Sequence, residues 1–253
     1  MRRLAAANAS TLQEVTLPTG VSEWQLERLL EPLTELTQIH LSAPADGTGR
    51  WIRHLTKSLR KLDLTGPGGT LEPRKLIRYD EYGVGLTVII RQAPDALLDQ
   101  LTVLAPHVTK LIIDECPNVT AGGLRQLLGA FTSLEDITLR GGLCGAVHET
   151  TLSVLNGCSQ LQILQLRAAN NSYTDIPAAA VCSLAVAFRK LRTLNINSTP
   201  ENSQSVLDAL LSAALGNDGD GWPRTLDLWA LESAYEQMKE PPSDSNIKLV
   251  ICT

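Results

Sequence analysis

The stretch 108–139, VTKLIIDECPNVTAGGLRQLLGAFTSLEDITL, contains the pattern that recurs along this chain. Leu111 and Ile113 are the alternating apolar residues of a short strand, and Cys116 and Val119 bring the chain back inward. Four apolar residues then follow at helical spacing: Leu124, Leu127, Leu128 and Phe131. The strand pattern restarts at Leu134, so the stretch predicts a strand, a turn, a helix and the next strand.

The strand part of this pattern has the form L-x-x-L-x-L, and it recurs on both sides of the stretch. Leu12, Leu36 and Leu59 begin three successive copies, at periods of 24 and 23 residues. Periods of this length are typical of leucine-rich repeats. The ten predicted strands are centred on Val15, Ile39, Leu62, Val88, Leu111, Ile137, Leu164, Leu194, Leu226 and Leu249. For the ninth strand we take Pro223, Leu226 and Leu228 as the three apolar positions.

We expect one domain over residues 1–253, with about nine to ten repeats, because every hydrophobic stretch belongs to a repeat. An irregular insertion at about 66–83 breaks the period, where GPGG is followed by a charged segment. Ser22 and Gln25 have capping-box spacing and predict the start of the first helix. A helix through Ala234 is expected after the ninth strand.

Composition excludes several classes of function. The chain has 253 residues, 43% of them hydrophobic and only 4% aromatic, so its core must consist mainly of aliphatic side chains. A formal net charge of -5 does not favour nucleic acid or membrane surfaces as partners, and the sequence contains no membrane span. The five cysteines include no CxxC pair and are expected to be reduced and buried. We expect an intracellular, cytoplasmic protein, with a mitochondrial location as the alternative because MRRLAAANAS is basic.

The repeats resemble a known family. Leu111, Ile113, Cys116, Val119-Thr120 and Gly123-Leu124 match the cysteine-containing leucine-rich repeat of F-box substrate-recognition proteins. Cys158, Leu161, Leu164 and Leu166 are similar to the same repeat read from its preceding cysteine. The resemblance implies an α/β fold, a right-handed horseshoe with a parallel concave sheet and outer helices, which binds other proteins. Because the repeats begin at Leu12, we expect no F-box.

The sequence gives no support for catalysis, a cofactor or a metal site. The histidines are dispersed, and no serine or cysteine has the context of a nucleophile elbow. Cys144 and His148 could supply half of a metal site, but there is no second pair of ligands. We therefore expect no enzymatic activity, no cofactor, no bound metal and no small-molecule substrate.

The polar positions of the strands must face the concave side, since neighbouring residues of a strand point to opposite faces. The residues that follow the last apolar position of each strand are expected to form one row across the sheet: Thr65, Arg91, Asp114, Arg140, Arg167, Asn197 and Trp229. Asn195 continues this predicted partner-binding strip. One interpretation is a solvated ion-pair network; the other is a docking strip for an acidic or phosphorylated segment, with Arg140 and Arg167 as anchors. We expect reversal of both arginines to leave stability nearly unchanged.

We therefore predict a non-enzymatic protein–protein interaction scaffold, a subunit of a larger intracellular complex that binds through its concave face and exposed ends. One alternative is a substrate-recognition subunit of a ubiquitin ligase whose core-binding segment lies on another chain. The other alternative is a regulator of a partner enzyme.

Overall fold

Ten strands form one parallel sheet in which the spatial order follows the chain order. The computed structural model describes residues 7–45, 47–67, 85–141, 143, 146–167, 176–213, 215–217 and 223–252. The strands are β1 (Glu14–Thr16), β2 (Gln38–Ser42), β3 (Lys61–Thr65), β4 (Leu86–Arg91), β5 (Val108–Asp114), β6 (Asp136–Arg140), β7 (Ile163–Arg167), β8 (Thr193–Ile196), β9 (Leu226–Leu231) and β10 (Ile247–Cys252). Each strand pairs with the strand of the next repeat, which confirms the α/β leucine-rich-repeat fold class.

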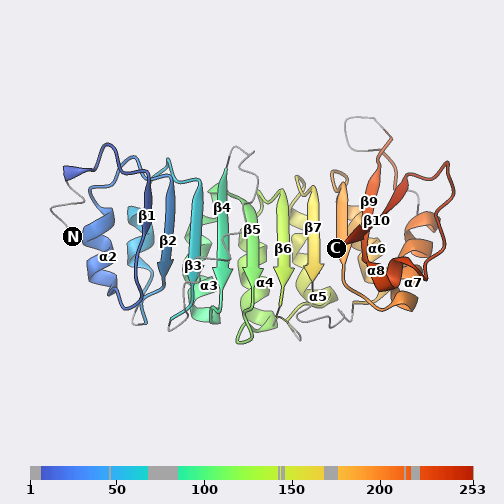
Figure 1. The fold of residues 1–253 in the computed structure, drawn as a ribbon, viewed down its shortest axis with the longest axis horizontal. Coiled ribbons are helices and arrows are strands. Elements are labelled where there is room, and N and C mark those ends of the chain that lie inside the picture. The colour runs from blue at the N-terminus through green and yellow to red at the C-terminus, as the bar shows by residue number, and fades with distance from the viewer. Residues whose placement is uncertain are drawn as a thin grey trace.

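Helices connect most of the strands. The α-helices are α2 (Glu23–Leu30), α3 (Asp95–Leu101), α4 (Ala121–Ala130), α5 (Glu149–Leu152), α6 (Ala178–Ala187), α7 (Pro200–Ser212) and α8 (Glu232–Tyr235). Three 3-10 helices lie at Arg50–His54, Thr102–His107 and Ser153–Gly157. Figure 1 shows the strands side by side, with α3, α4 and α6 behind them. We call the opposite side of the sheet the open face; it corresponds to the predicted concave face. Within the described residues, no helix is long and apolar enough to cross a membrane.

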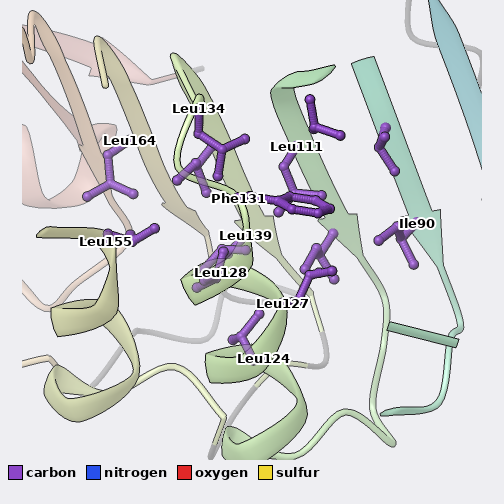
Figure 2. Packing of buried hydrophobic residues seen from close by; sticks show 14 of the residues in the cluster. Ile90, Leu111, Leu124, Leu127, Leu128, Phe131, Leu134, Leu139, Leu155 and Leu164 are labelled. Atoms are coloured by element: carbon purple, nitrogen blue, oxygen red, sulfur yellow. The ribbon is translucent and has the colours of Figure 1, made fainter. Parts of the chain in front are cut away.

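The apolar strand positions form the core between the sheet and the helices. Leu111 and Leu139 are buried on neighbouring strands, and α4 places Leu124, Leu128 and Phe131 against them (Figure 2). Phe131, at the end of α4, is fully buried and is one of the few aromatic side chains in this aliphatic core. Burying a side chain of this size contributes about 2–3 kcal/mol, so each repeat gains most of its stability from contact with its neighbours.

Carboxylates in the first turns of α2 and α3 bind the next repeat. Glu23 accepts hydrogen bonds from the Thr48 amide at 2.9 Å and from the Arg50 amide at 2.7 Å. Asp95 likewise accepts from the backbone amide and the hydroxyl of Thr120, the residue that caps α4. These bonds link successive repeats on the helix side. Burial by itself would raise the pKa of Glu23, but the hydrogen bonds from Thr48, Arg50 and the Trp51 backbone together hold it below its usual value of 4.5.

The hydrogen-bond ladder continues one residue past several strands. Gly66, Gln92, Glu115 and Gly141 each donate a backbone hydrogen bond to the next repeat. Gln92 and Glu115 have left-handed φ angles of 50° and 49°, which cost a non-glycine residue about 1 kcal/mol each. Gly66 lies so close to the following repeat that an added Cβ would be 1.9 Å from the Gln92 carbonyl oxygen. The chain therefore turns sharply just after the residues that form the predicted strip.

Several local predictions are confirmed and others need correction. The capping box of Ser22 and Gln25 is present at the start of α2. The ninth strand forms, but the pairing Leu194↔Leu228 shows that its apolar positions lie two residues later than predicted. Because side chains alternate with a period of two, a shift of two residues keeps the same face buried, and the pattern alone does not distinguish the two registers. The helix α8 has only four residues, and most of the predicted insertion at 66–83 lies outside the described residues.

A buried arginine that the sequence pattern did not single out joins the end of α6 to the start of β9. Arg224 is 2% exposed and donates hydrogen bonds to the carbonyl oxygens of Ala185, at 2.6 Å, and Leu191, at 3.0 Å. Ala185 lies in the last turn of α6, where carbonyl groups lack partners within the helix and carry partial negative charge. Burial lowers the pKa of Arg224. The side chain thus fixes the end of α6 against the start of β9.

Candidate partner-binding surface

Five of the predicted strip residues form one straight row across the open face. The strand register places Thr65 opposite Arg91, Arg91 opposite Asp114, Asp114 opposite Arg140, and Arg140 opposite Arg167. Neighbouring strands lie about 4.8 Å apart, so consecutive side chains of the row are within contact distance. We call Arg91, Asp114, Arg140 and Arg167 the charged row. The predicted neighbour relations among these four residues are confirmed.

Ion pairs connect adjacent strands at this row. Arg91 binds the carboxylate of Asp63, a residue of the neighbouring strand that is 2% exposed. His40, one strand further, lies with its Nδ1 atom 3.3 Å from the other carboxylate oxygen of Asp63. Arg140 binds Asp114 at 2.5 Å. Each carboxylate is more deeply buried than its arginine, so the arginines provide the charge compensation that makes burial of the carboxylates tolerable.

A further ion pair lies nearer the amino ends of the strands. Lys110 Nζ and Asp136 Oδ2 are 2.6 Å apart on β5 and β6. Burial nevertheless raises the pKa of Asp136, because the contact with Lys110 offsets only part of the cost of removing the carboxylate from water. The other carboxylate oxygen, Oδ1, is buried without a hydrogen-bond partner. This pair is an internal brace of the sheet rather than an exposed contact.

Arg167 differs from the other arginines of the charged row. Its Nη2 atom lies 3.1 Å from the thiol sulfur of Cys252, a residue of the last strand. Asn195 Nδ2 approaches the same sulfur at 3.5 Å. Among the residues that the structure describes, no carboxylate forms an ion pair with Arg167. Within the described chain, Arg167 therefore contacts a thiol where the other arginines of the row contact a carboxylate.

The remaining strip residues are arranged differently from the prediction. Asn195 and Asn197 are buried, and Trp229 lies opposite Asn195 instead of next to Asn197 in the row. Leu231, two residues further along β9, lies opposite Cys252 of β10. Trp229 is half-buried, and its Nε1 atom is shielded from solvent without a hydrogen-bond partner. The misplacement follows directly from the two-residue shift of the ninth strand.

The two predicted anchors are not equivalent. A glutamate at position 140 would face the buried Asp114 carboxylate across the strand pair, so the expectation that both arginines can be reversed without loss of stability does not fit this geometry. Arg167 carries no such ion pair among the described residues. It is the arginine of the row at which charge can be changed with the smallest structural consequence.

Sequence reasoning missed three residues of this surface: His40, Asp63 and Cys252. His40 and Asp63 lie one row closer to the amino ends of their strands, at polar positions that alternate with the apolar ones. That alternation could have identified both. The sequence pattern did not indicate Cys252, because this residue lies on β10, three strands after the strand of Arg167. In the described part of the chain, no group of three or more histidine, cysteine or acidic side chains could hold a metal, and Cys144 of the considered metal half-site lies outside it.

Comparisons with known proteins identify the fold. No family model matches the chain, and no curated protein matches its sequence. A chain in the crystal structure of the complex of Rad7 and Elc1 from yeast superimposes with a TM-score of 0.51 at 16% sequence identity. The matched region covers 92% of this chain and 56% of that chain, so this chain spans just over half of its neighbour's length. At this identity the likeness shows a shared leucine-rich-repeat-like architecture.

Proposed function

We propose that the protein is a non-enzymatic interaction scaffold, a subunit of a larger intracellular complex that binds a partner protein across the open face. The observation that carries this proposal is the charged row. Asp114 of the row and Asp63 beside it are buried and paired with arginines, whereas the side chains of Arg91, Arg140 and Arg167 are partly exposed. Arginine is enriched among residues that dominate interface energetics, because its planar group combines contact area with several directed donors.

The ends of the sheet are further candidate contacts. Along the described chain, β1 and β10 each pair with one neighbouring strand. An unpaired strand edge presents backbone donors and acceptors that another chain can bind. The structural neighbour was solved in complex with Elc1, which supports a role in an assembly for a chain of this architecture.

Site-specific photocrosslinking tests the proposal. Gln165 lies half-buried on the open face between Thr138 and Asn195, so a photoreactive residue there should crosslink to the partner in cells. Arg125 is exposed on α4, on the other side of the sheet, and provides the matched control position. We expect a discrete crosslinked product from position 165, and the purified partner should then bind the purified protein. Crosslinking of that partner only from position 125 would refute binding through the open face.

As the alternative, we propose that the repeats belong to the cysteine-containing subfamily and that the protein is a substrate-recognition subunit of a ubiquitin ligase whose core-binding segment lies on another chain. Two thiols occupy the family positions and bond to neighbouring repeats. The Ala93 amide donates to Cys116 Sγ at 3.4 Å, and Cys158 Sγ donates to the Phe131 carbonyl oxygen at 3.1 Å. Co-purification with a cullin-type ligase core tests this proposal. A complex that contains the crosslinked partner but no ligase component would exclude it and favour a scaffold or a regulator of a partner enzyme.

A further inference from the structure

Arg167 interrupts the alternation of charge along the open face. From Asp63 to Arg140, aspartates and arginines alternate on successive strands, and each of the two carboxylates is paired with an arginine. Arg140 and Arg167 then lie opposite one another on adjacent strands, with no carboxylate from the described chain between them. A guanidinium offers five donors, and a single contact with a thiol uses one of them. Counted over the described residues, the row therefore has an excess positive charge at this point.

A buried amide lies beside this excess charge. Arg167 and Asn195 converge on the same atom, the Cys252 sulfur, at 3.1 Å and 3.5 Å. Asn195 is 4% exposed, and its Oδ1 atom has no hydrogen-bond partner. The Arg167 guanidinium thus presents hydrogen-bond donors for an anion beside an amide oxygen that is shielded from solvent.

We propose that this area binds an aspartate or glutamate side chain from a segment of the partner protein. The carboxylate would lie between Arg140 and Arg167, next to Asn195. The Arg167 guanidinium would then exchange its thiol contact for a charge-assisted bond, the stronger of the two. This inference rests on the proposed function, because it specifies what the open face recognises.

The surroundings fit a carboxylate better than a phosphate group. Arg140 already binds Asp114 at 2.5 Å, which leaves it fewer donors for an additional anion. A dianionic phosphate has three oxygens to satisfy and would be placed near the buried carboxylate of Asp114, where repulsion is strong. A singly charged planar carboxylate matches the guanidinium fork and extends the charge alternation of the row by one step.

Peptide mixtures test the proposal without knowledge of the partner. The probes are capped, fluorescent nonapeptides with uncharged random residues at every position except the centre, which is Asp, Glu, Asn, Gln or phosphoserine. Binding to the immobilised full-length chain is measured at low ionic strength. The Asp or Glu mixture should be retained about tenfold more than the Asn or Gln mixture, as one charge-assisted contact predicts. The preference should disappear in R167Q and persist in R125Q, a matched loss of an arginine on the helix side.

Several results would overturn the proposal. Equal retention of the acidic and amide mixtures, or a preference that survives in folded R167Q, would exclude Arg167 as a carboxylate anchor. Stronger retention of phosphoserine would identify a phosphopeptide site instead. If R167Q melts early, the salt dependence of the wild-type preference decides, because a preference that persists at about 1 M salt does not come from this contact. Crosslinking from position 165 without a carboxylate preference would refute the anchor and leave the proposed function intact.

Discussion

Removal of Arg91 measures how strongly the open face depends on its ion pairs. In R91Q, the Asp63 carboxylate loses its arginine and keeps the contact with the His40 ring, at a position where its side chain is 2% exposed. Breaking a fully buried pair costs about 3–5 kcal/mol. Because the Arg91 side chain is 18% exposed and His40 remains, we expect R91Q to lower the free energy of unfolding by about 2–3 kcal/mol.

The matched control removes an exposed ion pair by the same substitution. Arg53 binds Glu27 at 3.2 Å with 65% of its side chain exposed, so R53Q should cost about 0.5 kcal/mol. Urea unfolding at pH 7, followed by circular dichroism, gives both values. A double-mutant cycle with D63N should recover about 1.5 kcal/mol or more of the loss in R91Q, because the buried charge is removed. If R91Q is no more destabilised than R53Q, the buried ion pair does not stabilise the sheet and the burial argument fails.

Three further predictions concern the scaffold. Because the pKa of Glu23 is lowered in the folded protein, its hydrogen bonds stabilise the protein above pH 4.5, and this stabilisation is lost as pH falls through the folded-state pKa. E23Q should therefore lower the free energy of unfolding, measured with urea, by about 1 kcal/mol at pH 7 and leave it unchanged at low pH. An equal loss at both pH values would contradict this linkage. Burial raises the pKa of the Cys116 and Cys158 thiols to about 11. A thiol reagent at pH 8 should therefore modify them at least about 100-fold more slowly in the native than in the unfolded protein. Rapid labelling of the native protein would refute their burial. G66A should lower the melting temperature by about 6 °C or more, because its Cβ would overlap a backbone oxygen. In the control G129A, the added Cβ makes an ordinary contact on α4, and the melting temperature should rise by about 2–4 °C. If calorimetry gives shifts of the same sign for both variants, the close approach at Gly66 is excluded.

The strands were predictable because each repeat applies the same spacing to the same core. Leu62, Leu111 and Leu164 are completely buried, as their positions in L-x-x-L-x-L require. Where a repeat departs from the pattern, the prediction failed. Ala230 is buried at the last apolar position of β9, but alanine is a weaker apolar signal than leucine. The prediction therefore placed Leu226 and Leu228 at the two positions that Leu228 and Ala230 occupy.

The candidate site was predictable as a row of positions but not as a set of contacts. The positions of Arg91, Asp114, Arg140 and Arg167 follow from the period of the repeat. Which carboxylate each arginine binds depends on side-chain reach across strands, and Arg91 binds Asp63 of β3, on the opposite side from its row neighbour Asp114 of β5. The contact between Arg167 and Cys252 joins residues 85 positions apart, beyond what any local pattern records.

The strand register of the charged row also limits the conformation of a segment that could follow it. Rungs of the row repeat at about 4.8 Å, whereas an extended chain places side chains on one face only every 6.5 Å or so. In an extended segment that crosses the strands, the side-chain spacing would therefore no longer match the strand spacing after a single strand. A helix advances about 5.4 Å per turn and stays within roughly 1 Å of register over two rungs. The spacing of the row therefore distinguishes two kinds of ligand. A helical segment can contact Arg140 and Arg167 with side chains from successive turns, whereas an extended segment can present only one side chain to this pair.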